Sequence, residues 1–114
     1  MNKYMLILFE SGDSYANMTP EEYQKEINAH GQWIAELGDR YDSGEPLENA
    51  SFSVRGKDRM VTDGPFIEAK ELVSGFYIIK AKSLEEATEL SKGCPILNLG
   101  GSVEVRPVMH IEMK

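Results

Sequence analysis

The 114-residue chain has little of what a disulfide-stapled or metal-built domain needs. Its one cysteine and two histidines exclude an internal disulfide framework and a thiolate zinc cluster, and we expect no dedicated metal site. Basic residues are also scarce: 12 Lys and Arg against 19 Asp and Glu give a net charge of −7. Phosphate-rich partners normally need a basic face, so we expect no binding to nucleic acid or to anionic membrane surfaces.

Long apolar runs are missing as well. The run 1–9 is too short for a membrane span and too lightly flanked for a signal peptide, so we expect a soluble, cytoplasmic protein. No linker or repeat divides residues 1–114, and a chain of this length can bury the core of one domain. It has no phosphate-binding loop, dinucleotide fingerprint or zinc-protease motif, so we expect no cofactor.

What the chain does contain is the alternation typical of strands. Period-two alternation and turn residues predict five strands, at 4–9, 50–55, 59–62, 72–81 and 103–111. The strands 50–55 and 59–62 form a hairpin. Both alternating sets are apolar in 4–9, which is typical of a central strand covered on both faces. The segment 44–47 is predicted to be irregular or an edge strand, because Pro46 has no N–H to donate.

Two helices are marked by their ends. Thr19 and Glu22 form a capping box at the start of the first helix, and Gly38 ends it. Ser83 begins the second helix, which ends at Gly93. The first helix carries an inner face at helical spacing: Tyr23, Ile27, His30, Ile34 and Leu37.

The order of these elements predicts an α+β fold. Apart from the extra hairpin strand, it is the split βαβ ferredoxin-like pattern, with an antiparallel sheet and two main helices. The helices would cover one face of the sheet and leave the other open. Because several strands are apolar on both faces, a single chain would expose a large apolar patch. The simplest solution is a two-fold homodimer in which the open faces meet.

The segment VTDGPFIEAKE at 61–71, continuing as GFY at 75–77, resembles the signature of the DGPF subgroup of the YCII-related proteins. The residues GEPL at 44–47, CP at 94–95 and EVRP at 104–107 fit the same pattern. The resemblance implies a dimeric α/β barrel on the ferredoxin-like plan, with no established activity. Related barrels include small lyases, isomerases and monooxygenases.

The same resemblance implies a catalytic histidine on the first helix, which here is His30. The aspartate of the family falls at Cys94, so Asp63 is the remaining carboxylate to pair with His30. An imidazole titrates near neutral pH and can act as a general acid and base. The alternative for His30 is a hydrogen-bonded core histidine, and for Asp63 a turn residue that accepts backbone N–H groups.

Two cations are candidates for substrate binding. Arg106, on a strand predicted to face the barrel cavity, can anchor a carboxylate or phosphate, or it can pair with Glu104 or contact a dimer partner. Lys70 can bind an anionic substrate or belong to a solvated surface run. Cys94 is predicted to be a small buried residue rather than a nucleophile, because it follows a helix end.

Three hypotheses on function remain open, and the sequence does not decide whether the chain is an enzyme. The first is a small cofactor-independent lyase, isomerase or hydrolase, in which His30 moves a proton and Asp63 or Arg106 positions a small organic substrate. The second is a non-catalytic ligand-binding or regulatory module. The third is a structural dimer whose DGPF motif serves folding. A His30 that borders a cavity would favour the first.

Overall fold

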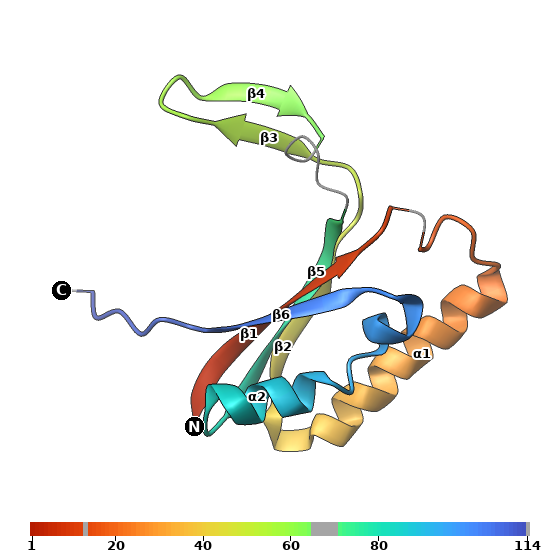
Figure 1. Cartoon of the computed structure of the whole chain (residues 1–114), viewed down its shortest axis with the longest axis vertical. Helices are drawn as coiled ribbons and strands as arrows, with labels where there is room; N and C mark the ends of the chain where they lie inside the picture. Colours follow the sequence, from red (N-terminus) through yellow and green to blue (C-terminus); the bar gives the residue numbers. More distant parts are fainter. Residues whose placement is uncertain (13, 65–70, 114) are drawn as a thin grey trace.

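The structure is a computed structural model that describes residues 1–12, 14–64 and 71–113. Four antiparallel strands form the main sheet in the order β2-β5-β1-β6. Their bounds are β1 Asn2–Glu10, β2 Tyr41–Pro46, β5 Leu72–Ala81 and β6 Ser102–Pro107. The helices α1 (Pro20–Leu37) and α2 (Leu84–Ser91) cover one face of this sheet (Figure 1). This arrangement confirms the predicted ferredoxin-like α+β fold.

The core lies between the sheet and the helices. Tyr4, Leu6 and Leu8 alternate along β1 and are buried on the helix-covered face. They belong to one cluster with Ile79 of β5 and with Ile96 in the short 3-10 helix η2 (Pro95–Leu99). The other set of β1 side chains is half-buried on the open face. The central position of β1 in the sheet is therefore confirmed, while the described chain covers only one of its faces with helices.

The capping signals of the first helix are confirmed. Thr19 Oγ1 accepts from the backbone N–H of Glu22 at 3.1 Å, and a Glu22 carboxylate oxygen accepts from the N–H of Thr19 at 3.2 Å. Gly38 ends the helix with φ of +55° and begins the 3-10 helix η1 (Gly38–Arg40). None of the described helices is long and apolar enough to cross a membrane.

One strand prediction is confirmed and another needs correction. Residues 44–46 of the segment 44–47 belong to β2, an edge strand paired with β5, which was one of the two predicted alternatives, and the register places Pro46 opposite Gly75. The start of β2 at Tyr41 was not predicted because its composition is polar, and an edge position tolerates the proline because one side needs no donor. The last strand ends at Pro107, not at 111. Beyond it Val108 N–H still donates to Lys3 O, but β1 begins at Asn2 and offers little further backbone to pair with.

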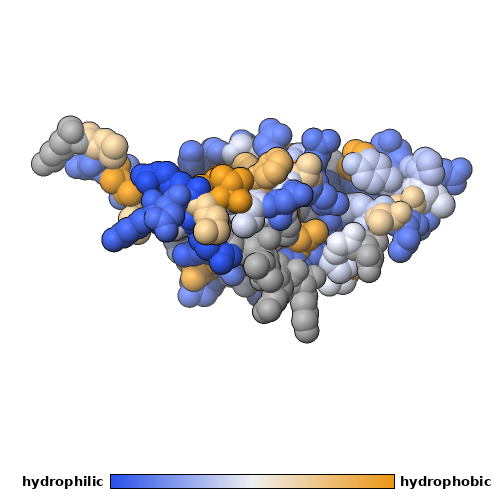
Figure 2. Space-filling model, turned by 90° about the horizontal axis from the view of Figure 1, so that it is seen from above, coloured by the Kyte–Doolittle hydropathy of each residue, from blue (hydrophilic) through white to orange (hydrophobic). Residues whose placement is uncertain are grey.

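The predicted hairpin exists as a separate two-stranded sheet, β3 (Phe52–Arg55) with β4 (Met60–Asp63). It stands away from the main sheet at the top of Figure 1. Four apolar side chains on it are largely exposed: Phe52, Val54, Met60 and Val61. The extended C-terminal segment also leaves the body, and apolar atoms are visible on it at the left of Figure 2. Both features leave apolar surface unburied in a single chain.

Gly64, which follows β4, has the backbone conformation that the sequence predicted. Its φ is +87°, and its N–H and C=O are fixed by bonds with Ser51 O (2.9 Å) and Ser53 Oγ (2.7 Å). Among the described residues, a Cβ built there meets nothing within 4 Å, so a side chain is opposed by backbone strain rather than by a clash with them. We expect Gly64→Val to lower the free energy of unfolding by about 1–3 kcal/mol in urea titrations.

Gly31 is the matched control for this prediction. It lies inside α1, where a Cβ also meets nothing within 4 Å and the backbone is helical. Gly31→Ala should therefore raise the free energy of unfolding by about 0.5–1 kcal/mol. Equal stability of Gly64→Val and the wild type would show that this glycine is not required by the backbone.

Candidate functional site

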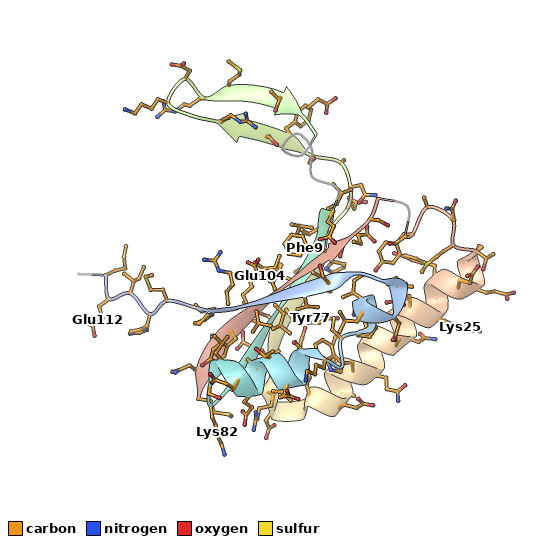
Figure 3. The ribbon with its side chains drawn as sticks, viewed as in Figure 1. Phe9, Lys25, Tyr77, Lys82, Glu104 and Glu112 are labelled. Carbon is orange, nitrogen blue, oxygen red and sulfur yellow. The ribbon has the colours of Figure 1, made fainter. Side chains whose placement is uncertain are left out.

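A cavity of about 730 Å³ opens between α1 and the part of the sheet formed by β2 and the start of β5. The end of β1 and the residues after β2 complete its wall. Four tyrosine side chains line it: Tyr15, Tyr23, Tyr41 and Tyr77. Tyr77 lies between the sheet and the helices in Figure 3. The volume and the largely aromatic wall suit a small organic molecule.

Four of the five residues in the helical stripe predicted to face the core line this cavity instead, and the fifth, Leu37, is buried in the core as predicted. Tyr23, Ile27, His30 and Ile34 are all in its wall, and Tyr23 and Ile27 are about half exposed. The side of α1 that is buried in the core carries Trp33 and Leu37. Adjacent rows on a helix differ by one position in sequence, so periodicity alone does not distinguish a core-facing row from a cavity-lining one.

His30 is held by contacts to both ring nitrogens. Nδ1 is 2.6 Å from the hydroxyl oxygen of Tyr77 on β5, and Nε2 is 3.1 Å from Oε1 of Glu26, one turn earlier on α1. The His30 side chain keeps 19% of its surface exposed, and it forms part of the cavity wall. His30 is therefore fixed in orientation and still accessible from the cavity.

These contacts favour one neutral tautomer. A carboxylate can only accept, so the proton belongs on Nε2, and Nδ1 then accepts from the Tyr77 hydroxyl. The Glu26 contact has the distance of an ion pair without the alignment of a hydrogen bond. Oε1 of Glu26 is buried and has no hydrogen-bond donor among the described residues.

The electrostatics of the site favour the uncharged form of His30. Burial lowers the pKa of His30 below 6.5, and the Glu26 carboxylate opposes this by favouring the imidazolium. Burial also raises the pKa of the Tyr77 phenol above its usual range. The imidazole is thus present as a free base, and the charge of Glu26 stabilises the imidazolium that forms when it takes a proton.

Two further polar residues lie in the same cavity. Glu10, the last residue of β1, is only 2% exposed, and burial raises the pKa of its carboxyl. Tyr15 is half-buried, and burial together with the charges of Glu26 and Glu10 raises the pKa of its phenol to about 12. Glu10, Glu26, Tyr15 and Tyr77 were not among the site residues predicted from the sequence. The cavity therefore contains more acid and phenol groups than were predicted.

The described chain does not bring Asp63 to His30. Asp63 ends β4 on the protruding hairpin and is exposed, whereas Glu26 and Tyr77 hold His30. The hairpin forms a sheet of its own instead of joining the main sheet, and this keeps Asp63 away from His30.

Arg106 does not reach the cavity either. The register pairs Val105 with Leu6 on the helix-covered face, so Arg106, opposite Met5, points to the open face. Its guanidinium is 3.9 Å from Glu104. This is the pairing that the sequence analysis gave as the alternative to substrate binding. Lys70 lies outside the described residues.

Cys94 is buried at the end of α2, as predicted for a small apolar residue. Burial raises the pKa of its thiol to about 11, which leaves it protonated and poorly nucleophilic. Among residues 1–12, 14–64 and 71–113, no group of three or more His, Cys, Asp or Glu is placed to hold a metal ion.

Comparison with known proteins gives three findings. The model of the YCII-related domain matches residues 4–112. An uncharacterized protein of Rhizobium meliloti (strain 1021) is 44% identical over 52 residues, which are 45% of this chain and 42% of that protein. The chain thus spans less than half the length of this curated relative.

The structure of 5-chloro-2-hydroxyhydroquinone dehydrochlorinase from Burkholderia phenoliruptrix, in complex with 2,5-dihydroxybenzoquinone, superposes with a TM-score of 0.55. That superposition has 16% identity and covers 96% of this chain and 95% of the other, so it shows a shared fold.

Proposed function

Since the chain belongs to the YCII-related domain family, we propose that it is a small enzyme whose His30 is the general acid and base for a small organic substrate. One observation carries the proposal. His30 borders a cavity of about 730 Å³ with a neutral imidazole, which is oriented by Tyr77 and backed by the carboxylate of Glu26. Proton transfer by a side chain needs a base, a hydrogen-bonded group that orients the base, and a counter-charge. His30, Tyr77 and Glu26 would supply these three parts.

The proposed step is removal of a proton from the substrate by His30. The imidazolium then forms beside Glu26, and the proton returns to a product atom or to water. The structural neighbour is named as a dehydrochlorinase, and loss of HCl needs a base that takes a proton while chloride leaves. The neighbour's substrate, 5-chloro-2-hydroxyhydroquinone, is therefore the first compound to test. The decisive comparison is chloride release by the wild type and by a variant without the imidazole.

The alternative is a ligand-binding module without catalysis, and the same cavity supports it. Such a module binds the compound without changing it, so isothermal titration detects heat of binding while chloride stays bound to the ring. Catalysis requires both binding and chloride release. The two functions are thus separated by one protein sample and two assays.

We also propose that two copies associate through the open faces of their sheets. Met5, Ile7, Phe76 and Ile78 are half-buried on that face without helices over them. Sedimentation should give about twice the 12.8 kDa chain mass, because a closed two-fold interface buries this face on both copies. Ile7→Asp should shift the mass to that of one chain, while Ile7→Val should keep the dimer. A wild type that sediments as a soluble monomer contradicts this proposal.

A further inference from the structure

Glu10 is a polar residue at a buried position of β1, where an apolar side chain is expected. It continues the alternation of Tyr4, Leu6 and Leu8 toward the helix-covered face and is 2% exposed. Its Oε2 is sealed from solvent, and no described residue donates a hydrogen bond to it. Burying a carboxyl without a partner is costly, so this side chain lowers the stability of the empty protein. Glu10 is costly to bury and lies in the cavity wall, which is the position expected of a residue that contacts a ligand.

The charges around the cavity select the kind of ligand. Four carboxylic acids line it, Glu10, Glu26, Glu45 and Glu48, and none of its described lining residues is Lys or Arg. A carboxylate or phosphate would enter against like charge and find no cation there. The aromatic side chains offer stacking surface for a ring. The wall is therefore suited to a ligand that is uncharged, aromatic and able to donate hydrogen bonds.

We propose that Glu10 binds a hydroxyl group of an uncharged hydroxylated aromatic ligand in the His30 cavity, and that the cavity excludes anionic ligands. The inference rests on the proposed function, because it places the ligand beside His30. It adds a binding residue and a substrate class.

Burial of the Glu10 carboxyl favours a hydroxyl ligand over an amine. Desolvation raises the pKa of this carboxyl and favours its protonated form. A protonated carboxyl donates one hydrogen bond and accepts another, and a hydroxyl group can accept the first and donate the second. An ammonium group brings a second charge that must also be desolvated beside the buried carboxyl. An organic cation is thus the competing ligand that the experiment must reject.

The test is isothermal titration, under anaerobic conditions, with three rings of similar size: hydroquinone, benzoate and benzylamine. We expect hydroquinone to bind the wild type at least tenfold more tightly than either charged ring. Glu10→Gln, which keeps one donor and one acceptor, should retain hydroquinone binding within about threefold. Glu10→Leu should weaken it at least tenfold and raise Tm by about 4–8 °C, because the buried carboxyl is gone. The control Glu36→Leu, on the exposed side of α1, should leave affinity unchanged.

Three results would overturn the inference. They are tighter binding of benzoate or benzylamine, no binding of hydroquinone by the wild type, and full hydroquinone binding by Glu10→Leu. The rise in Tm separates lost binding from lost folding. The proposed function fails separately: it fails if chloride release is independent of His30, whatever Glu10 does. Unchanged hydroquinone affinity in Glu10→Leu with activity still dependent on His30 refutes only the role of Glu10.

Discussion

Replacing His30 with glutamine is expected to slow chloride release from 5-chloro-2-hydroxyhydroquinone by about 10²–10⁴-fold, the usual contribution of a general acid or base. The amide side chain can still hydrogen-bond the Tyr77 hydroxyl, which is 2.6 Å from Nδ1 in the wild type. It cannot take a proton at neutral pH. The cavity should therefore keep its shape and lose its base, so turnover falls while Tm changes little.

His110 provides the matched control for this variant. It is the other histidine of the chain and lies in the exposed C-terminal segment beyond β6. His110→Gln makes the same chemical change away from the cavity and should release chloride at the wild-type rate. If His30→Gln and His110→Gln are equally active, His30 is not the base and the proposed mechanism is abandoned.

The largest loss of stability should come from Trp33→Ala. Trp33 is buried on the core side of α1, and its ring meets that of Tyr77 edge to face, with centroids 5.0 Å apart at 87°. Removing a buried indole costs about 3–5 kcal/mol through lost burial and the cavity left behind. Because Tyr77 loses the ring that positions it, we also expect His30 to lose its fixed orientation. Urea unfolding followed by circular dichroism measures the loss.

Ile27→Ala is the comparison within the same helix. Ile27 lines the cavity and is 47% exposed, so its truncation should cost less than about 1 kcal/mol. All variants must be measured at one protein concentration, because any association of chains makes the apparent stability depend on it. A loss below about 1 kcal/mol for Trp33→Ala would show that the core is not built around this ring.

Local signals predicted most of the fold. The capping box at Thr19, the glycine at Gly38 and the alternation along β1 and β5 each encode structure within a few residues, and the structure confirms them. The edge strand β2 was harder, because an edge strand needs neither apolar alternation nor a full set of donors. The detached hairpin was placed correctly along the chain, but its relation to the sheet depends on contacts that sequence patterns do not show.

The site was predicted only in part. His30 was identified as the histidine on the inner face of the first helix that matches the catalytic histidine of the family, and its partner Glu26 lies four residues earlier, a spacing that the sequence does contain. Glu10 had a signal too, since it continues the buried alternation of β1 as a polar residue, but the predicted strand ended at residue 9. Tyr77 becomes a partner of His30 only through the packing of α1 on the sheet, across 47 residues of chain. Asp63 and Arg106 were selected by chemistry alone, and the topology directs both away from the cavity.

The central claim, that His30 is a base exposed to the cavity, is tested most directly by NMR titration of its imidazole. A ¹⁵N-labelled His110→Gln protein leaves His30 as the single histidine. We expect a one-proton titration with a pKa below 6.5, set by burial, which falls further in Glu26→Gln because the carboxylate that stabilises the imidazolium is removed. An imidazole that does not titrate before the protein unfolds in acid, with or without Glu26, would mark His30 as a sealed core residue and contradict the account.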